Sequence, residues 1–240
     1  MYSIIRVQAN NVSIKGFKFD GDNPAHTSGI GANGTDTDIA EAITVESQLG
    51  GLAVENNIFQ SIAQIAVSIF QPYNSPSTSG NTVLNNKFTN IDNTITPGSN
   101  YGIGVLVYNN FYANIDGNCM DKVGIGVQTG NYHFGNPGTP ASISNNQIES
   151  RLIGIWYNLH YQAASNWDIS GNTLGTTTGA LTNTGLFVSS IQTAVGATIN
   201  NNTISNAKWG VELWNNPTSS TITVSGGSIS NCEYGVFANN

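Results

Sequence analysis

Eight copies of one short sequence pattern run along the chain, and they constrain its fold more than any other feature. Each copy has an aliphatic residue, a variable residue, a Gly or Asn, usually a second Asn, a variable residue and a large apolar residue. Successive copies begin 25 to 40 residues apart, a spacing at which a repeat indicates a solenoid. The copies begin at Ile14, Val54, Val83, Ile115, Ile143, Ile169, Ile199 and Val224, and they end at Phe19, Phe59, Phe88, Met120, Ile148, Leu174, Ile204 and Ile229.

A second pattern follows the first within each repeat and predicts a short strand. It consists of a small residue, a branched aliphatic residue, a variable residue and usually another apolar residue. This alternation with a period of two is typical of β-strands bounded by turns. The chain shows no sustained helical period, and it is rich in Asn, Thr, Ser and Gly, which are poor or mediocre helix formers. The copies begin at Ala42, Ala66, Gly102, Gly124, Gly154, Gly185, Gly210 and Gly235.

Short strands that recur at this spacing can stack as the coils of a parallel β-helix, also called a β-solenoid. We therefore predict an all-β, single-domain fold over residues 1–240, with about eight coils and loop insertions, the largest spanning residues 20–41. The two ends of the first pattern then form two inward columns. The Gly or Asn pair between them makes a sharp bend, because these residues tolerate left-handed backbone conformations. Stacked Asn side chains at that bend can hydrogen-bond from coil to coil.

The two patterns together resemble the repeat of the right-handed, single-stranded parallel β-helix in the pectate-lyase-like superfamily. The resemblance rests on the form I-x-G-N-x-I, as in Ile169–Leu174, and on the form Y-G-V-x, as in Tyr234–Phe237. It covers nearly the whole chain, and the stretch Asn11–Pro24 resembles repeat regions of large secreted bacterial proteins of this kind. The superfamily includes polysaccharide lyases, hydrolases, epimerases, phage tailspikes and adhesins. The resemblance thus implies a carbohydrate partner without choosing between cleavage and binding.

The composition favours a secreted or cell-surface protein. Only 9% of the residues are charged, the formal net charge is -7, and the isoelectric point is near 4.6. Such a chain lacks the basic surface that nucleic-acid binding requires, and no apolar run approaches the ~20 residues that span a bilayer. Cys119 and Cys232 fall in the fourth and eighth repeats, about 19 Å apart at the usual coil rise, which is too far for a disulfide.

Neither end of the chain shows a recognisable polar cap. Met1–Val7 enters a strand at once without a signal peptide, and the chain stops at Asn240 directly after the second pattern. A solenoid needs caps that cover its open core and its strand edges. We therefore expect the chain to be a fragment of a larger secreted protein, and we expect an open end to permit end-to-end self-association.

The largest insertion carries the one dense acidic patch of the sequence. Ca²⁺ prefers several carboxylate and carbonyl oxygens on a flexible loop, so the patch is a candidate calcium site. The segment Asp20-Gly-Asp-Asn lacks the full spacing of a calcium loop, and a solvated acidic loop with Asx turns is the competing interpretation. The candidate ligands are Asp20, Asp22, Asp36, Asp38 and Glu41.

Aromatic residues gather in and after the strands of the second pattern. Because these segments leave their coils at equivalent points, we expect the side chains to lie along one edge of the rod. Exposed aromatic rings can cover the apolar faces of sugars; alternatively, these rings cover the edge of the core and pack with one another. An exposed apolar cluster favours an interaction site. The candidate glycan-binding residues are Tyr108, Tyr112, Tyr132, Trp156, Tyr157, Tyr161 and Trp214.

Catalytic residues are harder to assign from the sequence. The chain lacks the Arg-x-Pro-x-x-Arg pattern of pectate lyases, the Gly-His-Gly of polygalacturonases and the Tyr-Gly-Phe-Asp-Pro-His of mannuronan epimerases. A base and a charge-stabilising group could still come from Arg151, His133, His160 and Glu149. The leading hypothesis is therefore a non-catalytic, carbohydrate-binding β-helix module. The alternatives are a polysaccharide lyase, epimerase or hydrolase, and a structural stalk or fibre segment.

Overall fold

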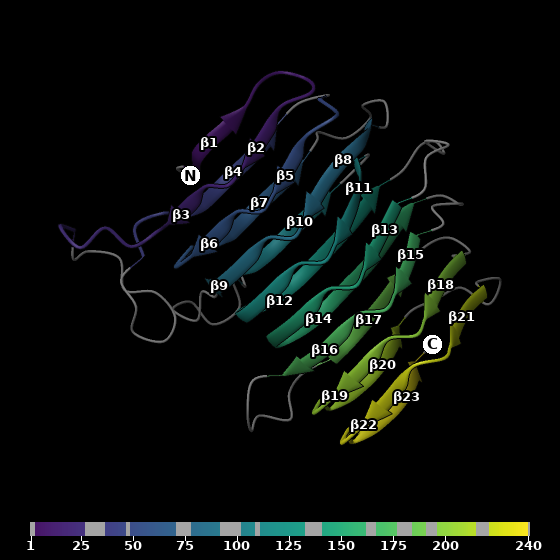
Figure 1. The fold of residues 1–240 in the computed structure, drawn as a ribbon. Coiled ribbons are helices and arrows are strands. Elements are labelled where there is room, and N and C mark those ends of the chain that lie inside the picture. The colour runs from purple at the N-terminus through teal and green to yellow at the C-terminus, as the bar shows by residue number, and fades with distance from the viewer. Residues whose placement is uncertain are drawn as a thin grey trace.

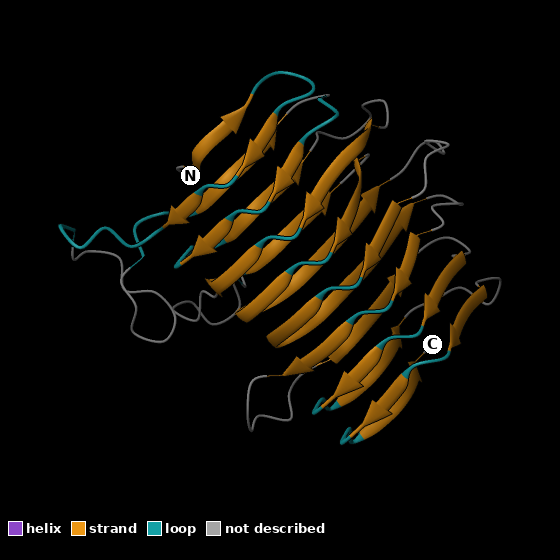
Figure 2. Cartoon of the chain, viewed as in Figure 1, coloured by secondary structure: helices purple, strands orange, loops and turns teal. Residues whose placement is uncertain are grey.

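The secondary structure that the computed structural model describes is entirely β-strand, which confirms the predicted all-β class (Figure 2). The described residues are 3–26, 37–46, 49–70, 78–91, 102–108, 111–132, 141–161, 167–176, 184–190, 196–214 and 221–239. All strand pairs among the described residues are parallel, and each strand pairs with the equivalent strands of the neighbouring repeats. The strands therefore stack from the N-terminal end to the C-terminal end of a β-solenoid (Figure 1).

The smaller of two sheets takes one strand from each copy of the first pattern. It has eight strands: β2 (Ser13–Lys15), β5 (Ala53–Glu55), β8 (Thr78–Leu84), β11 (Phe111–Asp116), β13 (Ala141–Ser144), β15 (Trp167–Ser170), β18 (Gly196–Asn200) and β21 (Thr221–Ser225). Five repeats, 53–70, 111–132, 141–161, 196–214 and 221–239, are described without a break through all their strands. The described residues thus trace about five complete coils rather than the expected eight, because the other repeats contain undescribed segments.

The larger sheet has 15 strands and bends into two faces. Its second face holds β3 (Lys18–Asp20), β6 (Ile58–Gln60), β9 (Lys87–Ile91), β16 (Thr173–Thr176), β19 (Thr203–Ser205) and β22 (Ser228–Ser230). Its third face holds β1 (Ser3–Val7), β4 (Glu41–Glu46), β7 (Ile65–Phe70), β10 (Ile103–Tyr108), β17 (Thr184–Ser190), β20 (Trp209–Trp214) and β23 (Tyr234–Asn239). Two long strands, β12 (Cys119–Tyr132) and β14 (Gln147–Tyr161), run round the bend and belong to both faces.

The two predicted inward columns form the core. Ile14 pairs with Val54, and the column continues coil by coil to Val224. In the other column the rings of Phe19, Phe59 and Phe88 stack with centroids 4.9 Å apart at each step. The members of both columns are buried except in the last coil. The predicted register is therefore confirmed.

The bend after the smaller sheet contains the predicted asparagine ladder. The N–H of Asn118 donates to Asn146 Oδ1 (3.0 Å), and Asn118 Nδ2 donates to the same oxygen (2.9 Å) and to the Val83 carbonyl (2.8 Å). The residue before each ladder position has positive φ where it is described, such as 65° at Gly117 and 53° at Asn145, which accounts for the Gly and Asn preference there. The ladder consists of Asn57, Asn86, Asn118, Asn146, Asn172 and Asn202.

The second pattern needs a small residue where a strand of the third face passes close to the inward side chains of the second face. A Cβ on Gly104 would lie 2.8 Å from the Gly126 carbonyl oxygen and 2.9 Å from Met120 Sδ. The strand register places Gly104 and Gly126, rather than Gly102 and Gly124, at this position. The expected alignment of these two repeats was wrong by two residues, because both sequences read Gly-Ile-Gly-Val and the close approach occurs only at the second Gly.

Candidate functional site

The outer side of the third face carries two columns of side chains that alternate with core residues. One column contains Trp156, Phe187, Glu212 and Phe237 in register. The other contains Phe70, Tyr108, Gly130, Asn158, Ser189 and Trp214 in register. Because successive side chains of a strand point to opposite sides, the intervening residues, such as Tyr157 and Val188, are buried in the core.

Six aromatic side chains lie on four neighbouring strands of this face, and their rings are in contact in two groups of three, Trp156–Phe187–Trp214 and Trp209–Phe237–Tyr234. The centroid distances are 5.7 Å for Trp156–Phe187, 6.0 Å for Phe187–Trp214, 6.2 Å for Trp209–Phe237 and 5.8 Å for Tyr234–Phe237. All four ring pairs are tilted, an arrangement that the quadrupoles of aromatic rings favour. Trp214 and Tyr234 are each 45% exposed. We call this set the aromatic row: Trp156, Phe187, Trp209, Trp214, Tyr234 and Phe237.

Polar groups hold parts of the aromatic row in place. Trp156 Nε1 donates to Ser189 Oγ (3.2 Å), and the Ser189 hydroxyl donates to Asn158 Oδ1 (3.0 Å). The Lys208 ammonium lies 4.3 Å from the Trp209 ring centroid, within the range of a cation–π interaction. The row therefore combines apolar ring surfaces with hydrogen-bonding groups whose positions are already set.

The carboxyl group nearest the centre of the row is that of Glu212. It lies in the same outward column as Trp156 and Phe187, and its Oε2 accepts a hydrogen bond from Thr184 Oγ1 (2.9 Å). Among the described residues of β10, β17, β20, β23 and the third-face parts of β12 and β14, it is the one carboxyl group.

A second, smaller aromatic pair lies on the same face nearer the N-terminal end. The rings of Phe70 and Tyr108 are stacked, with centroids 5.8 Å apart and an interplanar angle of 13°. The Tyr108 ring lies against Gly130 of the next coil, where any Cβ would collide with it. Tyr108 shares its column with Trp214, four coils further on, at a separation of about 19 Å.

The structure places three of the seven predicted glycan-binding aromatics on this outer face: Tyr108, Trp156 and Trp214. Tyr157 and Tyr112 are buried, so their assignment as exposed glycan contacts is wrong. Tyr157 occupies an inward position of its strand, and burial raises the pKa of Tyr112 to about 12. The backbones of Tyr132 and Tyr161 pair with each other, but their side chains lie outside the described residues.

Four members of the aromatic row were not predicted from the sequence: Phe187, Trp209, Tyr234 and Phe237. Phe187 and Phe237 occupy the variable third position of the second pattern, the position that Trp156 also occupies. Because the variable position of a half-buried strand points outward, the recurrence of aromatics there was a usable signal. Trp209 and Tyr234 pair with each other, and each directly precedes the small residue of the second pattern, Gly210 and Gly235.

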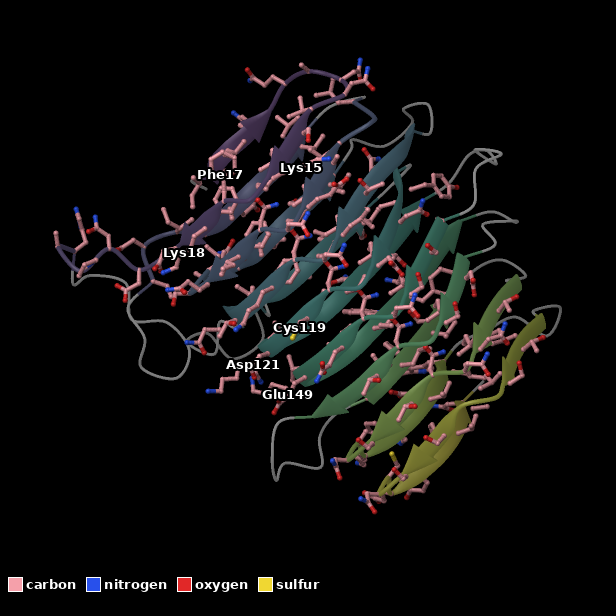
Figure 3. The ribbon with its side chains drawn as sticks, viewed as in Figure 1. Lys15, Phe17, Lys18, Cys119, Asp121 and Glu149 are labelled. Carbon is pink, nitrogen blue, oxygen red and sulfur yellow. The ribbon has the colours of Figure 1, made fainter. Side chains whose placement is uncertain are left out.

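The catalytic candidates do not form a described site. Glu149 lies on the second face next to Asp121, since the preceding residues Met120 and Ile148 pair directly (Figure 3). Arg151 follows in the same strand at the bend and is partly buried. His133 lies outside the described residues, and so does the side chain of His160. Neither Glu149 nor Arg151 is a neighbour of the aromatic row in the strand register.

The acidic insertion is described only in part. Asp20 Oδ2 accepts from Lys18 Nζ (3.1 Å) and from Gln60 Nε2 (2.6 Å). Desolvation raises the pKa of Asp20, but the hydrogen bonds from Lys18, Gln60 and the Asp22 N–H outweigh it, so the pKa is lowered overall. Asp38 Oδ2 accepts from the Asn23 N–H (3.0 Å).

Two acidic candidates remain, Glu41 and Asp36. Glu41 is buried in β4, where its carboxylate accepts a hydrogen bond from Thr44, and Asp36 lies outside the described residues. Within the described ranges, no three His, Cys, Asp or Glu side chains are grouped to hold a metal ion. In the described part of the insertion, Asp20 is already paired with Lys18.

For this reason we expect millimolar Ca²⁺ to leave the melting temperature of the chain unchanged. Lys18 already neutralises Asp20, and a ligand that binds only the folded state is required to raise the melting temperature. Differential scanning calorimetry with and without Ca²⁺ tests this, with Mg²⁺ as the matched ion. A rise specific to Ca²⁺ that disappears in an Asp36→Asn/Asp38→Asn variant would instead establish a calcium site in the insertion.

Two further expectations concern the thiols and the membrane. Cys119 and Cys232 are both free, as their predicted separation requires. Among the described residues, no helix has the length and hydropathy to cross a bilayer.

Comparisons with known proteins add no assignment. No protein-family model matches the chain, no curated protein matches it significantly, and no solved structure is significantly similar. The β-solenoid fold is therefore established by the strand pairing, and the finer relationship to the pectate-lyase-like superfamily stays a resemblance.

Proposed function

We propose that this chain is a non-catalytic carbohydrate-binding module, which holds an extended glycan along the aromatic row of the third face. The observation that carries the proposal is the presence of two groups of three aromatic rings on four adjacent strands of one face. Trp214 and Tyr234 are the exposed members of the row, and exposed apolar surface usually marks an interaction site. In line with the resemblance, we place the module in a secreted or cell-surface protein of the pectate-lyase-like type.

Sugars match the chemistry of this surface. The C–H faces of pyranose rings are apolar and pack on aromatic rings, while the hydroxyl groups at their edges need hydrogen-bonding partners. Trp214 offers an exposed ring, and Asn158, Ser189 and Glu212 lie in the adjoining positions of the same two columns. Because Trp156 is held by its bond to Ser189, little side-chain freedom remains to be lost on binding.

The shape of the surface favours a chain of sugar units. The row spans β14 to β23, and the Phe70–Tyr108 pair extends the aromatic surface toward the N-terminal end. From Tyr108 to Trp214 the surface covers about 19 Å, and a single small molecule would be better held by a closed pocket. The carboxylate of Glu212 and the ammonium of Lys208 lie close to the rings, and Glu233 directly precedes Tyr234. Because these charges are few and of both signs, the row suits a neutral glycan.

Binding fits this face better than hydrolysis does. Most glycoside hydrolases use two carboxyl groups on opposite sides of the scissile bond, and the described residues of this part of the third face include Glu212 alone. The observation that favours the enzymatic alternative is on the second face, where Asp121 and Glu149 are neighbours. Activity centred there would not depend on the aromatic row.

Replacing Trp214 by Ala is expected to weaken glycan binding at least about tenfold, because a central exposed aromatic ring typically contributes 2 kcal/mol or more to an interface. The fold should be retained, since Trp214 is not in a core column. The matched control is Phe17→Ala, which removes an exposed ring (58%) at the N-terminal end, away from the row, and should leave affinity unchanged. The measurement is a screen on a glycan array, followed by titration calorimetry with the best oligosaccharide.

The same preparation separates the three functional hypotheses. Incubation with the glycans that bind should release no new reducing ends and no unsaturated products. Release of either would identify a polysaccharide-active enzyme, and Asp121→Asn and Glu149→Gln would then be the first variants to assay. Equal affinity of the Trp214→Ala variant and the unaltered chain would refute the aromatic row as the binding surface. If the chain binds no glycan on the array and releases no product, the hypothesis of a structural stalk or fibre segment is the one that remains.

A further inference from the structure

The Tyr108 ring packs across onto the next coil, where a glycine makes room for it. The strand register places Gly130 of β12 directly beside Tyr108 of β10, and a Cβ on Gly130 would collide with Cδ2 and Cε2 of the Tyr108 ring. Among the described glycines, Gly130 is the one at which an added Cβ would meet an aromatic ring. The edge of the Tyr108 ring therefore occupies the space that a side chain at position 130 would fill.

The Phe70 ring is inclined in the same direction as the Tyr108 ring. Rings that stack squarely from coil to coil, such as Phe59 and Phe88 in the core, have centroids 4.9 Å apart, close to the coil rise of about 4.8 Å. The centroids of Phe70 and Tyr108 are 5.8 Å apart, yet their planes differ by only 13°. The two rings thus lean together toward β12, and this inclination turns one face of each ring away from the sheet.

The outward column between Tyr108 and Trp214 carries side chains that are shorter than these rings. It contains Gly130, Asn158 and Ser189 in register, which we call the polar floor. The Ser189 hydroxyl donates to Asn158 Oδ1 (3.0 Å), so the two polar side chains hold each other in place. The polar floor therefore separates two aromatic surfaces of one column, and none of its residues is charged.

We propose that Phe70, Tyr108 and Gly130 form a second glycan subsite, and that one extended, neutral β-1,4-linked chain bridges it to Trp214. This inference rests on the proposed function and adds the length and the shape of the glycan to it. A pyranose unit of such a chain is about as long as one coil rise, so about five units reach from Tyr108 to Trp214. The units in between place their hydroxyl groups over the polar floor.

Bridging makes the affinity depend on the length of the glycan. Once one end of a chain is bound, its other end meets the second aromatic surface at a high effective concentration. A shorter chain reaches one surface and gains nothing from the other. An α-1,4-linked chain coils instead of extending, so it contacts one surface at a time. We therefore expect affinity to rise steeply with length for extended chains alone.

Titration calorimetry with unbranched oligosaccharides of about two to eight units tests the bridge. The probes are the β-1,4-linked glucan, mannan, xylan and chitin series, with the α-1,4-linked glucan series as the contrast. For a β-1,4-linked series that binds, we expect affinity to rise at least about tenfold at about five units. Tyr108→Ala should abolish this rise, while the shorter members bind the variant and the unaltered chain with similar affinity at Trp214.

Gly130→Ala should abolish the same rise, because the added methyl group displaces the Tyr108 ring. The matched control is Gly175→Ala on the second face, where the nearest described atom to an added Cβ is Ser205 Oγ at 3.9 Å. This control should keep the full rise. Tyr108→Ala truncates an outward, partly exposed side chain, so it keeps the test decisive if Gly130→Ala does not fold.

Equal affinities for the short and the long members of each series that binds would overturn the bridge and leave Trp214 as a glycan contact. A rise that survives Tyr108→Ala would also overturn it, and so would an equal rise in the α-1,4-linked series. If no series binds, the proposed function fails and this inference fails with it.

Discussion

Replacing Phe59 by Ala is expected to lower the free energy of unfolding by about 3–5 kcal/mol, the usual range for a buried Phe. Phe59 is fully buried, and its ring lies 4.9 Å from the rings of both Phe19 and Phe88. The strands above and below are held in register by backbone hydrogen bonds, so the coils have little freedom to close the cavity. The lost dispersion contacts with two ring faces therefore add to the lost transfer energy.

Denaturant unfolding measures this effect, and Phe88→Ala should behave alike because its ring is buried in the same stack. The matched control is Phe17→Ala: this ring is 58% exposed in the first coil, and its removal should cost less than about 1 kcal/mol. Unchanged denaturant midpoints for both Phe59→Ala and Phe88→Ala would contradict the stacked core.

Replacing Asn146 by Ala is expected to cost about 3 kcal/mol or more, because it breaks the asparagine ladder in the middle. Asn146 is buried; its Nδ2 donates to the Ile115 carbonyl (2.9 Å), and its Oδ1 accepts from the N–H (3.0 Å) and the Nδ2 (2.9 Å) of Asn118. Removing the side chain leaves these partners buried without a hydrogen bond, at about 1–3 kcal/mol for each group. The loss should appear as a lower denaturant midpoint.

The neighbouring Asn145 supplies the control. It is exposed, has a φ of 53°, and makes a side-chain hydrogen bond to Asp116 at the surface. Asn145→Gly keeps access to the left-handed conformation, so the change in stability should be below about 1 kcal/mol. If Asn145→Gly were as destabilising as Asn146→Ala, the loss in Asn146→Ala could not be assigned to the buried ladder.

The sequence alone was sufficient for the fold class, the inward columns and the asparagine ladder. These features depend on the repeat itself, because equivalent positions of successive coils are brought into contact by parallel pairing. Ile14, Val54 and Val83 share a column for this reason, and so do Asn86 and Asn118 in the ladder. Their spacing along the chain carries enough information to place them.

The candidate site could be predicted only in outline. Trp156 and Tyr157 are adjacent in the sequence, yet one points outward onto Phe187 and the other is buried in the core. A shift of one residue exchanges the two sides of a strand, so their exposure depends on the exact register at the bend of β14. Uncertainty of register also explains why the sequence pattern aligned Gly102, rather than Gly104, with Ala66 of the preceding repeat.

The sequence by itself determined which equivalent positions of successive repeats stack on one another. These positions include the residues of the two inward columns and the asparagines of the ladder. Only the tertiary structure decided which surfaces were left over. It assembled Trp156, Phe187 and Trp214 from separate repeats into the aromatic row, and it placed Tyr157, the neighbour of Trp156 in the sequence, in the core. The physical reason is that exposure is a property of neighbours in space, and those neighbours come from coils some 25 to 40 residues away along the chain.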